Sequence, residues 1–597
     1  MFDLDTIRSR HAAVRSVMQS QKIDALVVPR ADEYLGEYIP ERNERLRWIS
    51  GFCGSAGMVF LLNDRAALFV DGRYTEQARQ QTAAELFEYH HLIDEPHLAW
   101  LARTLGPGKR VGYDPRLHTL TWQKRALEVL GGGDIQLVAL DRNPIDACWS
   151  DRPPAACSKA LLLAEIHTGK HSRDKRRNIS AAVVERGAEA ALIFATDSVA
   201  WLLNIRGSDV PHTPLLLGFA LIDAVGQVTL FTDPAKIPEG FAAHVGEGVT
   251  VCPEDAAPEA FRQLKGKRVL ADPDTANAWC QLSLAAAGAE LVAAQDPVIM
   301  PKACKNEVEV SGMRAAHRRD GAAVCRFLAW LDGEVAAGRL HDEAVLADKL
   351  YEYRSADPLF RDTSFDTISA SGANAALAHY RHSDTHPGRP AMDSIYLVDS
   401  GGQYLDGTTD ITRTVAIGEP DAERRRMFTL VLKGHIALDL ARFPKGTTGT
   451  QLDVLARQFL WQAGFDYDHG TGHGVGCFLS VHEGPQRIGK AWNATDLRPG
   501  MIISNEPGYY KSGAYGIRCE NLVLVTESHG SGETPMYGFE AITLAPFDAR
   551  LLDIGLMTQG ELQWLNAYHA RVEAEIGPLL DSQTRDWLKA ATRPLEA

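Results

Sequence analysis

The chain has 597 residues, 45% of them hydrophobic and 23% charged, the composition of an ordinary globular protein long enough for several domains. It carries 62 Lys and Arg against 77 Asp and Glu, and this net charge of −15 argues against nucleic acid as its main partner. No apolar run reaches the roughly 20 residues that a membrane-spanning helix needs, so no membrane association is expected. Nine cysteines without a CxxC pair, and a start that does not resemble a signal peptide, favour the cytoplasm.

The first half of the sequence contains an internal repeat. The block that ends at Asp32 returns ending at Asp197, VFLLNDRAALFVD is echoed by FALIDAVGQVTLFTD, and KRVGYDP is echoed by KRVLADP, always in the same order. Because chance rarely keeps three blocks in register, we predict two copies of one α/β domain, at residues 1–155 and 156–302. Each copy is expected to run through an amphipathic helix, a strand, a hairpin, a helix and a second strand.

From residue 303 onwards the pattern changes to long helices and glycine-rich strands. Apolar residues on one face predict a long helix over residues 308–331 and a shorter one over 343–353. A strand hairpin over 394–418 follows, and then helices over 421–442 and 450–464, the latter with Thr450 and Asp453 as a capping pair. Helices, strands, helices and strands in this order predict one domain, 303–597, of two similar halves with a helical C-terminal extension.

Residues 469–476, HGTGHGVG, place two histidines four residues apart among four glycines. Each interior glycine costs a helix about 1 kcal/mol relative to alanine, so the segment is expected to be a loop or a strand. In a strand His469 and His473 would lie ~13 Å apart, too far to share one ion. One ring is therefore expected to be a metal ligand and the other to face the substrate; the alternative is a glycine-rich turn with solvated imidazoles.

Four acidic residues stand at the ends of apolar segments: Asp399, Asp410, Glu506 and Glu520. Buried together, these carboxylates would repel one another and would need a counter-charge. Arginines such as Arg413 and Arg518 are one source of it, and two divalent cations bridged by the carboxylates are a better one. Four acids with one histidine form a hard, oxygen-rich ligand set suited to Mn²⁺, Co²⁺ or Zn²⁺.

DGTTDITRT, GTGHGVG, VHEGPQ, NEPGYY and GIRCEN resemble the motifs of the pita-bread metallopeptidases, and the duplicated first half is similar to that of their three-domain aminopeptidase P subgroup. The resemblance covers the whole chain. It implies an α/β (α+β) fold with two related creatinase-like N-terminal domains and a C-terminal pita-bread catalytic domain. It also implies that Asp399 chelates one metal ion, that His473 and Glu506 hold the other, and that Asp410 and Glu520 bridge the two.

The same resemblance implies roles around the substrate. His379, His469 and His482 would surround it. Apart from the resemblance, Arg518, two residues before Glu520, is expected to support the ligands or neutralise their surplus charge, and it is also a candidate for contact with the substrate. The implied enzyme removes the N-terminal residue from peptides with proline in second place, by means of a hydroxide that bridges two divalent ions, most plausibly Mn²⁺. Glu506 would handle a proton, and His379 and His482 would donate hydrogen bonds to the developing oxyanion. A cytoplasmic homodimer is the implied assembly.

Three alternatives remain at this point. A prolidase shares the ligand set but usually carries one N-terminal domain and cuts only dipeptides. A catalytically silent pita-bread module would bind peptides or proteins, although such relatives lose their ligands and this chain retains all five. A two-metal phosphoesterase is disfavoured because no phosphate-binding glycine loop accompanies the acids. Cys519, beside Glu520, departs from the family pattern; strand alternation predicts that it points away from the metals.

Overall fold

The computed structural model describes residues 4–382, 387–528 and 532–596. The chain forms two compact units, which we describe separately. Unit 1 contains residues 1–163 and 170–299, and unit 2 contains residues 164–169 and 300–597. The two units do not coincide with the three predicted domains, whose boundaries remain a prediction.

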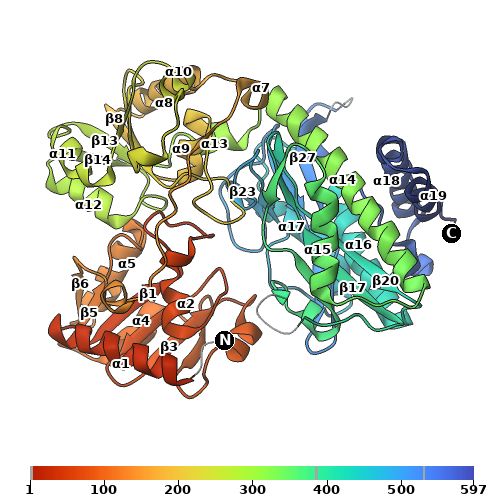
Figure 1. Ribbon diagram of the computed structural model, residues 1–597, viewed down its shortest axis with the longest axis horizontal. Helices are drawn as coiled ribbons and strands as arrows, with labels where there is room; N and C mark the ends of the chain where they lie inside the picture. The colour runs from red at the N-terminus through yellow and green to blue at the C-terminus, as the bar shows by residue number, and fades with distance from the viewer. Residues whose placement is uncertain (1–3, 383–386, 529–531, 597) are drawn as a thin grey trace. The chain divides into compact units, whose positions relative to one another are not determined.

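Unit 1 contains two six-stranded sheets with the same topology (Figure 1). The first sheet has the order β4-β3-β2-β1-β5-β6, and the second has the order β12-β11-β10-β8-β13-β14. Corresponding neighbours agree in direction: β1 pairs antiparallel with β2 and parallel with β5, as β8 does with β10 and β13. The predicted duplication of an α/β domain is therefore confirmed.

The strands of the first sheet are β1 (Ala25–Pro29), β2 (Met58–Leu62), β3 (Ala66–Val70), β4 (Glu88–His91), β5 (Arg110–Tyr113) and β6 (Gln136–Ala139), with helices α1 (Leu4–Ser20), α4 (His97–Leu105) and α5 (Leu120–Gly131). Those of the second are β8 (Ala190–Ile193), β10 (Phe219–Asp223), β11 (Val228–Phe231), β12 (Val249–Cys252), β13 (Arg268–Ala271) and β14 (Glu290–Ala293), with helices α8 (Ser172–Glu185) and α12 (Ala278–Ala286).

Helices cover both faces of the first sheet. Because successive side chains of a strand point to opposite faces, each strand contributes to two separate cores. Leu26 and Val28 of β1 belong to the core that α1 closes, whereas Ala25 and Val27 belong to the core that α4 and α5 close. All five residues of β1 are buried, as expected for a strand covered on both faces.

Unit 2 repeats the order of helices followed by strands, as predicted. Its long helices before the extension are α14 (Glu307–Ala336), α15 (Glu343–Ser355), α16 (Ala422–Asp439) and α17 (Gly449–Gln462). A capping box between Asn306 and Glu309 begins α14. The predicted cap of α17 was wrong: Thr448 and Gln451 form the capping box, and Asp453 instead pairs with Arg457.

Two of the sheets of unit 2 contain the strands that carry or adjoin the predicted metal ligands. One joins β16 (Ile368–Ser371), β17 (Ser394–Ser400) and β20 (Ile411–Ile417); the other has the order β21-β28-β27-β24-β22-β23. The latter strands are β21 (Phe443–Pro444), β22 (Gly472–Gly474), β23 (Glu483–Ile488), β24 (Ile502–Asn505), β27 (Asn521–Ser528) and β28 (Met536–Ala541). β17 and β20 pair antiparallel as predicted, but two short strands, β18 (Gly402–Tyr404) and β19 (Gly407–Thr408), lie in the connection between them.

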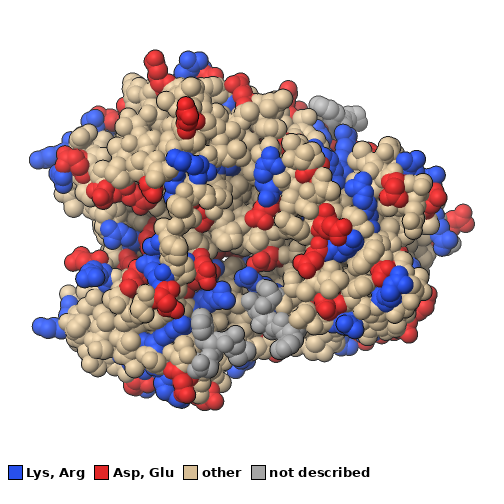
Figure 2. All heavy atoms as spheres, viewed as in Figure 1, with Lys and Arg blue, Asp and Glu red and all other residues tan. Residues whose placement is uncertain are grey.

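The C-terminal extension is helical, as predicted, and consists mainly of α18 (Gln559–Ile576) and α19 (Ser582–Ala591), drawn in dark blue in Figure 1. Both helices pack against α14. Among the residues that the structure describes, none of the helices is long and apolar enough to cross a bilayer. On the face shown in Figure 2, acidic and basic side chains are interspersed.

Candidate metal centre

Each of the five predicted metal ligands lies in a strand of unit 2 or directly next to one. Asp399 lies in β17 opposite Thr412 of β20, Asp410 directly precedes β20, His473 is the central residue of β22, Glu506 directly follows β24, and Glu520 directly precedes β27. The ligands therefore come from strands of the β16-β17-β20 sheet and of the six-stranded sheet of unit 2, or from residues next to those strands. The prediction that HGTGHGVG is not helical is confirmed, since its central part forms β22.

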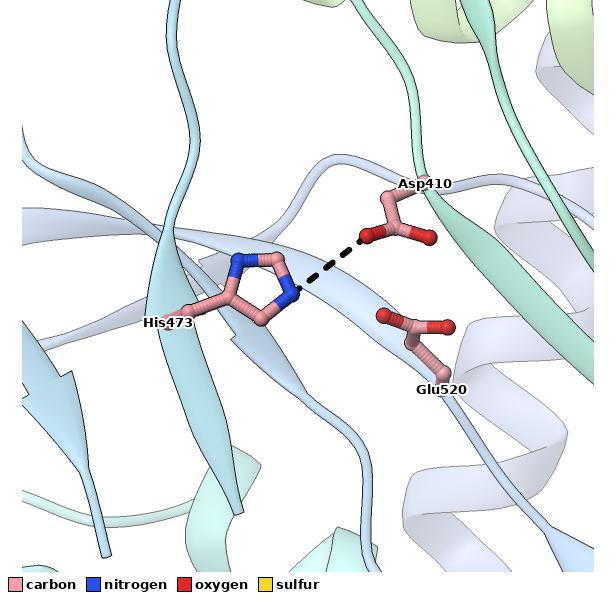
Figure 3. Close-up of side chains that lie close together, drawn as sticks. All are labelled: Asp410, His473 and Glu520. Carbon is pink, nitrogen blue, oxygen red and sulfur yellow. Dashed lines mark ion pairs between the residues drawn. The ribbon is translucent and has the colours of Figure 1, made fainter. Parts of the chain in front are cut away.

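Three of these side chains point toward one another (Figure 3). One ligand atom from each of Asp410, His473 and Glu520 lies within 4.8 Å of the other two. His473 Nε2 is 3.5 Å from Asp410 Oδ2 and also 3.5 Å from Glu506 Oε1, so Glu506 belongs to the same cluster. Asp399 is close enough to interact with the cluster, because its negative charge contributes to the raised pKa of both Asp410 and Glu520.

The hydrogen bonds of His473 leave Nε2 as the atom that faces the acids. Nδ1 lies 2.9 Å from the carbonyl oxygen of Gly474, and since a carbonyl only accepts, Nδ1 carries the proton. In the neutral ring the lone pair of Nε2 then faces the carboxylate oxygens of Asp410 and Glu506, an unfavourable arrangement unless a proton or a cation lies between them. Metal-binding histidines usually donate their other ring N–H to a carbonyl in this way.

Burial and mutual repulsion disfavour the charged forms of the acids. Burial, followed by the charges of Glu520, Asp399 and Glu506, raises the pKa of Asp410 well above its usual value. Burial and the charges of Asp399 and Glu506 do the same to the pKa of Glu520, and burial raises the pKa of Glu506 to about 7. Among the described residues, Asp399 Oδ1 and Asp410 Oδ1 are buried without a hydrogen-bond partner. These oxygens and His473 Nε2 fit a site for divalent cations.

Arginine supplies only part of the counter-charge that the sequence predicts. Arg518 is buried and forms an ion pair with Asp399 Oδ2. It also donates to Tyr510 Oη at 2.5 Å and to Thr412 Oγ1 at 3.1 Å, so three neighbours already hold its guanidinium. Arg413 points to the other face of β20 and donates to the backbone carbonyl of Glu520 rather than to its carboxylate.

The three predicted substrate histidines occupy different places. The His482 ring lies 4.3 Å from the His473 ring in an edge-on arrangement, and so borders the acid cluster. His469 is bound through Nδ1 to the Gly470 carbonyl at 2.7 Å and through Nε2 to Tyr510 Oη at 2.9 Å. His379 is half-buried on the segment after the 3₁₀ helix η4 (Gly372–Ala376).

Two hydroxyl residues near the acids were missed by the sequence analysis. Thr412 Oγ1 donates to Glu520 Oε2 at 2.7 Å and accepts a hydrogen bond from Arg518 Nε. Ser504 Oγ accepts from the backbone N–H of His473 at 2.9 Å and donates to Glu506 Oε1 at 3.1 Å. Strand alternation could have identified Thr412, which lies two residues after Asp410 in β20, and it correctly predicts that buried Cys519 packs in the core.

The glycines of HGTGHGVG allow the strands that carry the ligands to approach closely. A Cβ atom at Gly472 would collide with the carbonyl oxygen of Ser504, and one at Gly474 would collide with the carbonyl oxygen of Glu483. Any larger residue at these two positions would push β22 away from its neighbours, so glycine is required for packing here.

Four family models match successive parts of the chain. The model described as metallopeptidase family M24 matches residues 311–527, and that for the C-terminal region of these peptidases matches residues 535–595. Two models described as the creatinase/prolidase N-terminal domain match residues 10–147 and 151–309.

Similar proteins extend over nearly the whole chain. A probable Xaa-Pro aminopeptidase P from Tuber melanosporum is 40% identical, covering 98% of this chain and 99% of its own. Aminopeptidase P2 from Arabidopsis thaliana is 39% identical, covering 96% and 86%. The crystal structure of X-prolyl aminopeptidase from Caenorhabditis elegans, described as a cytosolic enzyme with a di-nuclear active site, is 34% identical with a TM-score of 0.95, covering 99% and 100%. An Xaa-Pro dipeptidase from Bacillus anthracis shares the fold over 63% of this chain, with 24% identity and a TM-score of 0.52.

Proposed function

Because this chain belongs to the Xaa-Pro aminopeptidase P family of M24 metallopeptidases, we propose that it hydrolyses the first peptide bond of peptides whose second residue is proline. The observation that carries the proposal is the convergence of Asp410, His473 and Glu520 within 4.8 Å. The full-length relatives support the substrate class, since several of them are named for activity at Xaa-Pro bonds.

We assign two divalent cations to this centre. Asp399 would chelate one, His473 and Glu506 would hold the other, and Asp410 and Glu520 would bridge them. The di-nuclear active site of the Caenorhabditis elegans enzyme supports the number of ions. Four carboxylates with a single imidazole favour Mn²⁺, with Co²⁺ or Zn²⁺ as alternatives.

When bound, a pair of such ions lowers the pKa of a coordinated water toward neutrality and offsets negative charge that develops on the attacked carbonyl. The residues of this chain would do the rest. Glu506, at the edge of the cluster beside His473, is proposed to accept and return a proton. His482, against the His473 ring, and His379 are proposed to donate hydrogen bonds to the oxyanion. His469 is proposed to line the pocket, and Arg518 to orient Asp399 and the substrate.

Selectivity for proline has a physical basis in the substrate. Proline has no amide N–H, so a peptidase that needs to hold that donor would fail at this bond. A pocket shaped for the pyrrolidine ring would select proline instead. We further propose that the enzyme is a cytoplasmic homodimer with domains at residues 1–155, 156–302 and 303–597, in line with the description of the Caenorhabditis elegans relative as cytosolic.

The experiment compares an Xaa-Pro-Xaa tripeptide, an Xaa-Pro dipeptide and an Xaa-Ala-Xaa tripeptide as substrates. Protein freed of metal with a chelator is expected to be inactive, and added Mn²⁺ should restore cleavage of the Xaa-Pro-Xaa peptide alone. Cleavage restricted to the dipeptide would identify a prolidase instead. Absence of bound metal together with absence of activity on adding Mn²⁺, Co²⁺ or Zn²⁺ would identify a silent binding module.

A further inference from the structure

Arg413 connects the β16-β17-β20 sheet of unit 2 to its six-stranded sheet, close to the acid cluster of the metal centre. Its strand, β20, belongs to the three-stranded sheet, whereas β27 belongs to the six-stranded one. The guanidinium donates through Nη1 to the Glu520 carbonyl at 2.5 Å and through Nη2 to Asn521 Oδ1 at 2.8 Å. Asp410 lies three residues before Arg413, so Arg413 ties the strand that follows Asp410 to the backbone that carries Glu520.

The surroundings of Arg413 hold it in one position. Its side chain is buried, and it also donates to the backbone carbonyls of Thr412 at 2.9 Å, Pro546 at 3.1 Å and Ala545 at 2.7 Å. The guanidinium also lies 4.0 Å from the centre of the Phe547 ring. A planar guanidinium with this many fixed acceptors is a rigid connector, and lysine could not reproduce its geometry.

Helix α18 of the C-terminal extension supplies a further partner. Tyr568 Oη lies 3.0 Å from Arg413 Nη2, 3.3 Å from Asn521 Oδ1 and 3.0 Å from the Ala545 carbonyl. The Tyr568 side chain is buried, and its ring stacks on that of Trp564 one turn earlier in α18. The extension therefore reaches Glu520 through only one intermediate side chain.

We propose that the C-terminal extension positions the metal-binding carboxylates, with Tyr568 of α18 acting through Arg413 to hold Glu520 opposite Asp410. The proposal rests on the proposed function, which makes Asp410 and Glu520 the bridging ligands. Tyr568 and Arg413 are positioning residues, because neither side chain contacts the acid oxygens. The C-terminal extension would thus have a role in metal binding.

The test is to measure Mn²⁺ binding to the full-length chain by isothermal titration calorimetry in wild type, Tyr568→Phe and Trp564→Phe. Phenylalanine at 568 keeps the ring but removes the hydroxyl that bonds Arg413. We expect Mn²⁺ affinity to fall about tenfold or more, as it does when outer-shell partners of metal ligands are lost, and kcat at saturating Mn²⁺ to stay close to that of the wild type.

Trp564→Phe is the matched control. Trp564 lies in the same helix and the same aromatic stack, but its Nε1 donates to Asp439 at 2.8 Å instead of to the Arg413 cluster. It should lower the melting temperature without changing Mn²⁺ affinity. Amide hydrogen exchange on metal-free protein is a second measurement: faster exchange at residues 520–522 is expected in Tyr568→Phe and not in Trp564→Phe.

The possible outcomes distinguish this inference from the proposed function. If wild type binds two Mn²⁺ ions and Tyr568→Phe binds them equally well, the inference is wrong and the proposed function stands. If both variants weaken Mn²⁺ binding equally, the extension acts only through general stability and the inference is again wrong. If wild type binds no metal, both proposals are overturned.

Discussion

Asp410 lies where burial and three neighbouring carboxylates all disfavour its charge. A carboxylate in such surroundings either takes up a proton or gains a cation, because an unpaired buried charge is costly. Its Oδ1 atom is buried without a hydrogen-bond partner among the described residues, and its Oδ2 atom faces the Nε2 atom of His473. Both atoms are thus placed as a bridging ligand would require.

Asp410→Asn tests this interpretation with two opposite effects. Loss of a bridging ligand should remove bound Mn²⁺, measured by elemental analysis after dialysis, and reduce activity by more than about 100-fold, the upper end of the loss expected for an outer-shell partner. In metal-free protein the same change should raise the melting temperature, because asparagine is neutral without taking up the proton that a buried Asp410 among repelling carboxylates would need.

The matched control is Asp406→Asn, which changes an acid of the same connection that pairs with Arg319 outside the cluster. It should retain metal and activity. Loss of Mn²⁺ from both variants, or a lower melting temperature of metal-free Asp410→Asn, would contradict the assignment of Asp410 as a bridging ligand.

At the scale of elements, one buried residue, Glu343, holds the segment that carries the predicted substrate residue His379. Glu343, the first residue of α15, is fully buried. Its carboxylate accepts hydrogen bonds from the N–H of Ser371 at 2.8 Å, from the hydroxyl of Tyr380 at 2.7 Å and from the N–H of Gly388 at 2.7 Å. It therefore anchors the described residues on both sides of His379.

We predict that Glu343→Gln loosens this segment. Glutamine replaces one carboxylate oxygen by an NH₂ group, which cannot accept a hydrogen bond. At least one of the buried donors that now bond Glu343 would lose its acceptor, at a cost of about 1–3 kcal/mol. KM for the tripeptide should rise more than kcat falls, since metal ligands are untouched. Glu352→Gln, on an exposed position of the same helix, is the control. Equal kinetic constants for Glu343→Gln and wild type would contradict a positioning role for Glu343.

In unit 1, burial lowers the pKa of His118 to about 4. The centre of its ring lies 3.9 Å from that of Trp122, with the two planes tilted by 33°, and Nδ1 lies 3.0 Å from the Asp114 carbonyl oxygen. Below a pH of about 6.5 the unfolded chain binds a proton that the folded chain does not, so the stability of unit 1 falls as the pH falls toward 4. At pH 5 this histidine alone should lower the free energy of unfolding by about 2 kcal/mol.

The check is amide hydrogen exchange in β1 and β5 at pH 8 and pH 5, after correction for the intrinsic pH dependence of exchange. His118→Gln should lose about 2 kcal/mol less stability on acidification than wild type does. Equal losses in the two proteins would show that His118 titrates normally in the fold.

Much of the element pattern follows from the sequence alone, and some of it does not. Apolar periodicity predicts α14 and α16 as helices, but not that consecutive residues such as 320–325 of α14 and 431–436 of α16 are buried, on all sides of each helix. The cap at Thr448 was missed because two similar short motifs overlap, and only backbone geometry decides between them. Arg413 was considered a counter-charge for the acids because it is close to them in sequence, although strand alternation places it, three residues after Asp410, on the other face of β20.

At the scale of the whole molecule, the duplicated topology of unit 1 was predictable from its repeated blocks. The meeting of Asp410 with Glu520 was not derivable from pattern alone, because the strands that follow them, β20 and β27, belong to different sheets. The ligand set came from the resemblance to a family.

The most direct test of the central claim is anomalous X-ray diffraction at the manganese edge, from crystals of the protein grown with Mn²⁺. The account predicts two peaks roughly 3.5–4 Å apart, surrounded by Asp399, Asp410, His473, Glu506 and Glu520. Crystals with full Mn²⁺ but no peak among these side chains, or with their carboxylates paired to arginines instead, would contradict it.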